Sequence, residues 1–267
     1  MSLFQLILVA LIQGLTEFLP VSSSGHLILL PSLTGMEDQG QAIDVAVHIG
    51  TLFAVIIYFW ADVRIAIGGI GRLAKGRVDT QGARLALYLG IATIPVIIFG
   101  LILKLTGMDA MLRSVALIGW TMLIFGLVLY WTDQRGATAK TAPDWSTKDA
   151  LIMGLWQAIA LIPGTSRSGA TISGARQLGY AREDAAKLSM LMSIPTIIAS
   201  GAVLGLDVIS TANMQLAKDS LIAAVFAFVA ALLALSLMMR LLKSVSFTPY
   251  VIYRIFLGIG LLIFAYS

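Results

Sequence analysis

The stretch Gln13-Gly-Leu-Thr-Glu-Phe-Leu-Pro-Val-Ser-Ser-Ser-Gly-His26 interrupts a run, residues 3–32, that is otherwise mostly apolar. A second apolar run, residues 150–176, is interrupted by Pro163-Gly-Thr-Ser-Arg-Ser-Gly169. Each apolar half is too short to cross a bilayer alone, because the ~30 Å hydrocarbon core takes about 20 helical residues. Irregular backbone at membrane depth persists only where protein or a wet cavity surrounds it. Both regions are therefore predicted to be re-entrant helix–turn–helix hairpins.

The rest of the chain is dominated by apolar segments. Of its 267 residues, 58% are hydrophobic and 12% are charged, whereas soluble domains carry about 25% charged residues. We expect one all-α polytopic membrane domain, residues 1–267, in which the two hairpins accompany six spanning helices. The chain has no Cys, which excludes disulfides and Cys-ligated metals, and its +4 net charge does not indicate nucleic-acid binding. The six predicted spans are residues 42–60, 86–105, 112–131, 184–206, 219–240 and 249–266.

The basic residues predict the orientation of these spans. Twelve of the 18 Lys and Arg residues fall on one side of the layout, and three lie within apolar segments. The other side receives only Lys104, Arg113 and Lys218. Since loops rich in Lys and Arg stay in the cytoplasm, the first side is predicted to be cytoplasmic. Both termini and the start of the first hairpin then face outward, and the second hairpin begins at the cytoplasmic side.

The two hairpins are similar to each other. Pro20-Val-Ser-Ser-Ser-Gly25 aligns with Pro163-Gly-Thr-Ser-Arg-Ser-Gly169 with one insertion, and a Gln precedes each proline. Three spans follow each hairpin, and three is odd, so the segments 1–131 and 150–267 are predicted to have opposite orientations. This pattern indicates an inverted-topology repeat, which places a site near the midplane where the repeats meet. Chance similarity between two Ser- and Gly-rich turns is the alternative.

Three ionisable residues, Glu17, His26 and Arg167, interrupt these apolar runs. A charged residue inside a bilayer costs at least ~2.5–3.5 kcal/mol on insertion scales and marks a functional site by default. A Ser hydroxyl becomes an effective nucleophile when an adjacent base takes its proton. In the first hairpin, either His26 or Glu17 can be that base. Gln13 stands four residues before Glu17, on the same face of a helix.

The second hairpin has the composition of an anion-binding turn. The planar fork of Arg167 matches phosphate oxygens, and the glycines beside it allow the N–H groups at a helix start to approach an anion. Ser166, Ser168 and Thr171 add hydroxyl donors. A nucleophile with its base on one hairpin and an anion cradle on the other would suit phosphoryl transfer, which depends mainly on positioning and charge stabilisation.

Simpler structural roles remain open for the same residues. The serine run can cap a helix, and Arg167 can pair with Glu17 only to hold the hairpins together. His48 is interpreted as packing or as a helix–helix hydrogen bond. Lys187 and Arg254 are interpreted as residues that snorkel or pair with an acidic neighbour.

The run from Gln13 to His26 closely resembles the first signature of the bacterial undecaprenyl-diphosphate phosphatases of the bacitracin resistance type. Pro163-Gly-Thr-Ser-Arg-Ser-Gly-Ala-Thr171 resembles their second signature. The resemblance covers essentially the whole chain. It implies a hydrolase that acts on a phosphorus anhydride, converts undecaprenyl diphosphate to the monophosphate and phosphate, and recycles the lipid carrier for peptidoglycan synthesis. It also implies a multi-pass protein of the bacterial inner membrane with a site that faces outward, a divalent cation such as Mg²⁺ or Ca²⁺, and assembly as a homodimer.

The resemblance also implies roles for individual residues. Ser23 matches the nucleophile, His26 the imidazole that works with it, Glu17 the second glutamate of a glutamate-rich motif, and Arg167 the phosphate-binding arginine. The choice between Ser22 and Ser23 as nucleophile stays open, as does the choice between a phosphoserine intermediate and direct attack by water. The remaining residues expected to bind substrate are Gln13, Ser22, Ser24, Ser166, Ser168 and Thr171.

Gln13 departs from the family pattern, because many members have a glutamate at this position. Gln keeps an acceptor oxygen but cannot act as a base, which transfers any acid–base or metal role to Glu17. Glu17 is accordingly the best candidate for a metal ligand. Mg²⁺ suits such a site, because it usually keeps several waters and binds substrate phosphates.

A transporter is the alternative from another class. Inverted repeats with broken helices at the midplane are typical of transporters, and Arg167 with its serines can bind an anionic head group. However, anion binding alone has no evident need for a base beside a hydroxyl. This residue set therefore favours the phosphatase.

Overall fold

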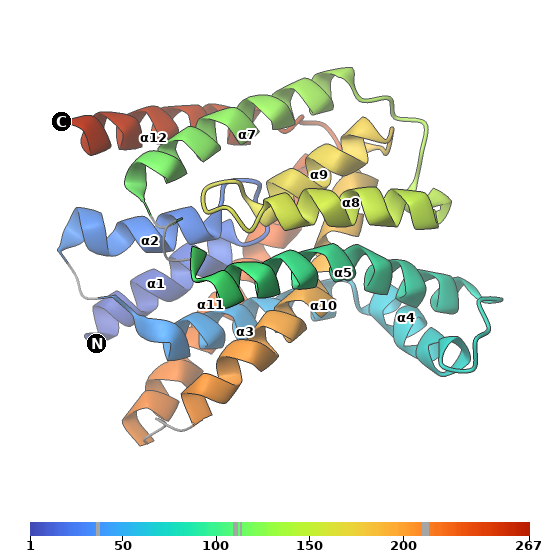
Figure 1. Ribbon diagram of the computed structural model, residues 1–267, viewed down its shortest axis with the longest axis horizontal. Coiled ribbons are helices and arrows are strands. Elements are labelled where there is room, and N and C mark those ends of the chain that lie inside the picture. Colours follow the sequence, from blue (N-terminus) through green and yellow to red (C-terminus); the bar gives the residue numbers. More distant parts are fainter. Residues whose placement is uncertain (36–37, 109–111, 113, 210–213) are drawn as a thin grey trace.

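The computed structural model describes residues 1–35, 38–108, 112, 114–209 and 214–267, and in this part of the chain every regular element is helical (Figure 1). All six predicted spans are confirmed as helices long and apolar enough to cross a membrane. Arg113, which the sequence assigns to the outward side, lies outside the described residues. The six helices are α3 (Gly40–Tyr58), α5 (Gln81–Thr106), α7 (Val115–Arg135), α10 (Arg182–Ile209), α11 (Met214–Leu241) and α12 (Thr248–Tyr266).

Each predicted hairpin is a pair of shorter helices joined by a tight turn. The first consists of α1 (Leu3–Thr16) and α2 (Ser23–Thr34), and the second of α8 (Thr147–Ile159) and α9 (Arg167–Gln177). They come from opposite ends of the molecule, and their turns meet near its middle (Figure 1). This is the arrangement that an inverted repeat requires. The re-entrant placement in a bilayer and the limits of the two repeats stay predictions.

The two turns share an unusual backbone. Ser22 and Ser166 cap α2 and α9, and both have a positive φ, 72° and 73°. Each caps its helix by accepting the N–H of a glycine three residues later, Gly25 or Gly169. Non-glycine residues in such conformations cost roughly 1–3 kcal/mol and cluster at active sites. The structure thus aligns the serines without the insertion that the sequence comparison needs, and it places Ser23 and Arg167 at the same position, the first residue of each helix.

Each hairpin packs against the half of the chain that contains the other hairpin: α1 against α11, and α8 against α5. Glycines allow both contacts, because a Cβ at Gly14 would meet the backbone oxygen of Ala227 at 2.6 Å and one at Gly154 would meet that of Ala92 at 2.6 Å. Small residues allow helix backbones to approach closely in membranes, where no hydrophobic force drives association. The two halves therefore interlock around the turns.

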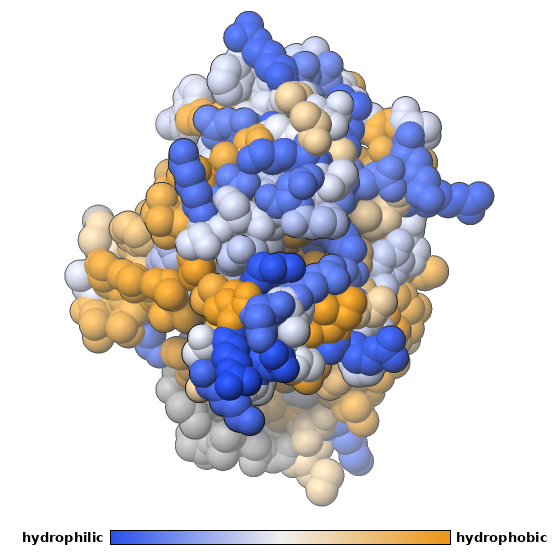
Figure 2. All heavy atoms as spheres, turned by 90° about the vertical axis from the view of Figure 1, so that its right-hand side faces the viewer, coloured by the Kyte–Doolittle hydropathy of each residue, from blue (hydrophilic) through white to orange (hydrophobic). Residues whose placement is uncertain are grey.

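Polar side chains gather at the end of the molecule that contains the α4–α5 and α7–α8 connections, and hydrophobic side chains surround them (Figure 2). The sequence did not predict two elements here, α4 (Trp60–Leu73) and the 3₁₀ helix η1 (Ala142–Asp144). Arg176 and Arg182 both pair with the buried Asp133, at 3.1 and 2.7 Å. Lys187 pairs with Asp62 at 2.7 Å, one of the two roles expected for it.

Arg254 has neither of the roles expected from the sequence. Its side chain is fully buried, and no acidic partner is found among the described residues. The guanidinium instead donates to four backbone carbonyls. Two of these belong to the hairpin turns, Pro20 at 3.3 Å and Gly164 at 3.0 Å, and the others are those of Thr121 and Met122 on α7. Arg254 therefore ties both turns to α7 and α12.

Candidate active site

A cavity of about 180 Å³ lies where the two turns meet. It is lined by six of the residues predicted from the sequence, which come from both hairpins, by Ala160 at the end of α8, and by residues of α3 and α10. The predicted residues are Glu17, Ser22, Ser23, Ser24, Ser166 and Arg167, and the others are His48, Ala160, Thr196, Ile197 and Ser200.

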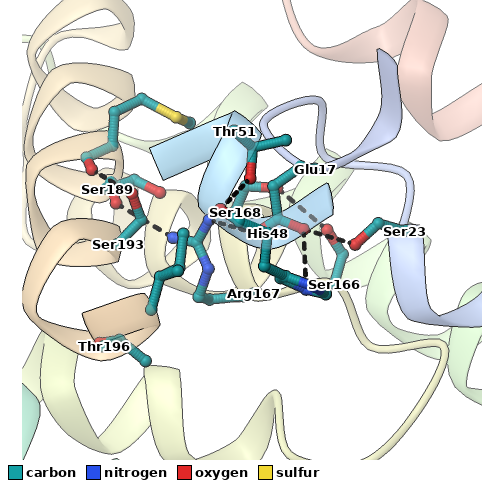
Figure 3. Close-up of polar contacts among 12 residues, drawn as sticks. Glu17, Ser23, His48, Thr51, Ser166, Arg167, Ser168, Ser189, Ser193 and Thr196 are labelled. Carbon is teal, nitrogen blue, oxygen red and sulfur yellow. Dashed lines mark hydrogen bonds and ion pairs between the residues drawn. The ribbon is translucent and has the colours of Figure 1, made fainter. Parts of the chain in front are cut away.

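Glu17 is the centre of the polar contacts around this cavity (Figure 3). Its carboxylate Oε1 accepts from Arg167 Nη2 at 3.0 Å. Its Oε2 accepts from the hydroxyl of Ser23 at 2.7 Å and from the amide of Gln13 at 2.9 Å. The side chain is only 6% exposed, and a carboxylate so buried is tolerated because a cation and hydrogen-bond donors surround it. Arg167 and Glu17 join the hairpins, as the structural alternative for Arg167 requires, but Arg167 also lines the cavity.

Ser23 is the predicted nucleophile, and the nearest base to its hydroxyl is Glu17. His26 lies elsewhere: its Nδ1 bonds the carbonyl oxygen of Ser22 at 2.7 Å, and its Nε2 bonds the hydroxyl of Tyr253 at 2.5 Å. The rings of His26 and Tyr253 are also stacked. Of the two bases that the sequence left open, the geometry brings Glu17 to Ser23.

Ser168 and Thr171 are buried supports in this geometry and do not line the cavity. Ser168 Oγ donates to the carbonyl oxygen of Leu19 at 2.9 Å, which links the hairpins. Thr171 Oγ1 lies 2.5 Å from Ser189 Oγ and so links α9 to α10. Both residues hold α9 in place, and Arg167 is the first residue of that helix.

Two helix N-termini converge on the cavity, since Ser23 begins α2 and Arg167 begins α9. The first N–H groups of a helix have no intrahelical partner, and the helix dipole favours negative charge at this end. Together with the Arg167 guanidinium, they make a site suited to a phosphate group.

The described residues offer no ready cage for a metal ion. They contain no group of three or more His, Cys, Asp or Glu residues that can hold one. The sequence predicts Glu17 as the best ligand, but both of its oxygens already accept hydrogen bonds from Arg167, Ser23 and Gln13. Oε1 accepts only from Arg167, so a cation at Glu17 would bind the second lone pair of this oxygen, next to the positively charged guanidinium.

His48 lines the cavity, although the sequence analysis interpreted it as packing or as a helix–helix hydrogen bond. It projects from α3, and its Nε2 lies 3.9 Å from Glu17 Oε2. A signal was present, since His48 is an ionisable residue inside a predicted span. No motif in the surrounding sequence indicated a role for His48, because α3 lies next to the hairpins only in the folded protein.

Comparison with known proteins gives a family match over most of the chain. The family model described as bacitracin resistance protein BacA matches residues 6–260. The chain belongs to this family. It is 72% identical to the undecaprenyl-diphosphatase of Roseobacter denitrificans and 71% identical to that of Dinoroseobacter shibae, over the full length of both proteins. It is 46% identical to undecaprenyl-diphosphatase 1 of Rhodospirillum rubrum, over the whole chain and 96% of that protein. The BacA match includes both hairpin turns, five of the six long helices in full, and α12 as far as residue 260.

Proposed function

We propose that this chain hydrolyses undecaprenyl diphosphate to undecaprenyl phosphate and inorganic phosphate, and so recycles the lipid carrier for peptidoglycan synthesis and confers resistance to bacitracin. The observation that carries the proposal is the contact between Ser23 and Glu17 beside Arg167, at the start of two converging helices. The BacA family membership and the names of the relatives support the same activity.

The geometry supports an in-line displacement at the terminal phosphorus. Arg167 and the helix N-termini bind the terminal phosphate and stabilise the charge on its oxygens. Ser23 Oγ then attacks the phosphorus while Glu17 Oε2 takes the hydroxyl proton. The bond to the bridging oxygen breaks, and undecaprenyl phosphate leaves with the bonding electron pair. Water hydrolyses the phosphoserine in a second step. Ser23 is preferred to Ser22 as nucleophile, because Ser22 Oγ accepts the N–H of Gly25 as the helix cap.

The proposal includes a divalent cation, Mg²⁺ or Ca²⁺, that arrives with the substrate. Diphosphate oxygens and water would supply its ligands, since the described residues contain no group of three or more His, Cys, Asp or Glu side chains that could hold it. Such an ion neutralises charge on the phosphates. This form of binding is usual for Mg²⁺, which dehydrates reluctantly and prefers substrate phosphates to all-protein cages.

The location is the bacterial inner membrane, with the cavity open to the outer face. The distribution of Lys and Arg supports this orientation, as do the two termini, which lie at the end opposite the α4–α5 connection (Figure 1). The prenyl tail lies in the bilayer beside the spanning helices. A homodimer and the lack of a nucleic-acid partner belong to the same proposal. The family resemblance supports the first, and the low charged fraction of 12% supports the second.

The test is phosphate release from purified protein in detergent with undecaprenyl diphosphate and Mg²⁺ or Ca²⁺. The wild type is expected to release phosphate, and Ser23→Ala and Arg167→Ala to lose nearly all activity while they remain folded. Ser22→Ala separates the two serines. An inactive wild type with either ion, or full activity in both variants, contradicts the proposal and favours transport of an anionic lipid. A phosphoryl group trapped on Ser23 under rapid quenching supports the covalent route over direct attack by water.

A further inference from the structure

His48 faces the proton acceptor of the reaction. Its Nε2 lies 3.9 Å from Glu17 Oε2, which is the oxygen that binds the Ser23 hydroxyl (Figure 3). The imidazole lines a cavity large enough to hold water, and its side chain is 37% exposed. Glu17 itself is only 6% exposed. His48 is therefore the imidazole through which a proton on Glu17 can reach solvent.

A backbone contact determines which ring nitrogen of His48 is free. Nδ1 lies 2.7 Å from the carbonyl oxygen of Asp44, and a carbonyl only accepts. Nδ1 therefore carries the hydrogen, and in the neutral ring Nε2 holds a lone pair directed to the cavity. The same reasoning gives His26 no free nitrogen: its Nδ1 donates to the Ser22 carbonyl, so its Nε2 accepts from Tyr253.

Glu17 is poorly suited to keep the proton that it receives. Its ion pair with Arg167 and the amide of Gln13 both favour the charged carboxylate. Histidine is the side chain that most often takes up and releases protons in catalysis. A direct transfer over 3.9 Å is too long for a hydrogen bond, but a single water can bridge it in a cavity of about 180 Å³.

We propose that His48 is the terminal proton acceptor of this phosphatase and receives the proton by way of Glu17. This inference rests on the proposed function. In the first step, the Ser23 O–H bond breaks and the Oγ–P bond forms. The proton passes through Glu17 to His48 Nε2, and the bridging P–O bond breaks as undecaprenyl phosphate leaves. In the second step, water attacks the phosphoserine, a water proton returns to Ser23 Oγ through Glu17, and His48 releases its proton to solvent.

The surroundings of His48 are consistent with a role that depends on its charge. Two charged groups share the cavity with it, Glu17 from the first hairpin and Arg167 from α9. On the α10 side, the cavity is lined by the uncharged residues Thr196, Ile197 and Ser200. On its own helix, the Asp44 carboxylate accepts from Gln39 at 2.9 Å. Protonated His48 thus faces one carboxylate and, when substrate is bound, the phosphate that the cavity receives.

The test compares His48→Gln and His48→Ala with wild type for undecaprenyl diphosphate hydrolysis across pH. Gln keeps a hydrogen-bonding group but takes up no proton at neutral pH. We expect kcat to fall at least ~100-fold in both variants, the low end for lost acid–base catalysis, while KM changes little. The acidic limb of the kcat/KM profile is lost with the imidazole. Added imidazole restores part of the activity of His48→Ala, with a pH dependence that follows the free base.

Ile49→Ala is the matched control, because Ile49 is the next residue of α3 and its side chain is 40% exposed, away from the cavity lining. It is expected to keep wild-type kinetics. The inference is overturned if His48→Gln keeps the wild-type kcat and the same acidic limb, or if imidazole restores nothing to a folded His48→Ala. In either case, the proposed phosphatase function still stands if the wild type is active. An inactive wild type refutes the proposed function instead.

Discussion

At the scale of single residues, the carboxylate of Glu17 combines two roles that the sequence analysis left open as alternatives, the base for a serine hydroxyl and the partner of Arg167. It orients Arg167 through one oxygen and accepts the Ser23 hydroxyl through the other. Gln13 donates to the second oxygen as well. These contacts fix the positions of both Arg167, the anion-binding group, and Ser23, the nucleophile.

Glu17→Gln tests this double role. The amide keeps the size of the side chain but loses the charge, so it neither accepts the Ser23 proton nor pairs with Arg167. We expect kcat to fall ~10²–10⁴-fold, the range for general acid–base groups. His26→Ala is expected to cost less, because Ser22 and Tyr253 occupy both nitrogens of His26. Steady-state phosphate release from both variants checks this order. A larger loss of kcat in His26→Ala would identify His26 as the base.

Local sequence predicts part of this site. Glu17, Ser23 and Arg167 stand in polar runs that break apolar segments, and that contrast indicates function without any knowledge of the fold. The rotamer of His26 depends on Tyr253 of α12, and the position of His48 depends on how α3 packs beside the hairpins. Contacts between residues so far apart in the chain have no local pattern. The residues alone therefore left His26 and Glu17 open as the base, the family resemblance paired His26 with Ser23, and His48 was interpreted as packing or a helix–helix hydrogen bond.

At the scale of helices, close packing around glycine holds the spans together. A Cβ at Gly50 of α3 would lie 2.2 Å from the backbone oxygen of Ala224 on α11. Backbone atoms have little room to move, so the added methyl group forces the helices apart. Gly68 of α4 has nothing within 4 Å of the corresponding position, so the same substitution meets no neighbour there.

We expect Gly50→Ala to destabilise the protein by ~1–3 kcal/mol, the usual cost of overpacking. Gly68→Ala is the control and is expected to stabilise α4 by up to ~1 kcal/mol, because Ala is the better helix former. Denaturant unfolding of both variants in the same detergent measures the difference. Equal stabilities would mean that α3 and α11 move apart to accommodate the methyl group without a loss in the free energy of unfolding.

Arg254 is the second determinant at this scale, because one side chain fixes the turns of both hairpins. Arg254→Leu removes four hydrogen bonds and leaves the carbonyl oxygens of Pro20 and Gly164 without this donor. A buried group that loses its partner costs ~1–3 kcal/mol, so we expect a loss of stability and of nearly all activity.

Arg254→Lys keeps the charge but not the planar fork, and it is expected to recover stability more fully than kcat. The measurement pairs thermal unfolding with phosphate release for both variants. Wild-type kcat in a folded Arg254→Leu variant would show that the turns keep their geometry without Arg254.

Helices were predicted more completely than their packing. The six spans followed from hydropathy and length, which need no tertiary information. The helix α4 was missed because Asp62, Arg64, Arg72 and three glycines between residues 60 and 73 suggest a loop. Its Gly69 packs closely against Gly82 of α5. That tertiary contact, which the composition does not show, accounts for the helix.

At the scale of the whole molecule, the opposed hairpins determine how the chain can lie in a membrane. Their turns meet through the bonds from Arg167 to Glu17 and from Ser168 to Leu19. If each hairpin re-enters, both of its ends face the same side of the bilayer, and the two hairpins face opposite sides. If either hairpin crosses fully, its two ends face opposite sides.

Cysteine labelling distinguishes these topologies, and the chain has no native Cys to remove. Single cysteines at the exposed positions Ser2 and Asp38 flank the first hairpin, and those at Lys148 and Glu183 flank the second. With a thiol reagent that does not cross membranes, we expect the first pair to react in intact cells once the outer face is accessible. The second pair is expected to react only in inverted vesicles. Opposite accessibility within either pair would contradict the inverted repeat. The hairpins would then not bring a nucleophile and an anion-binding turn together from the two faces of the membrane.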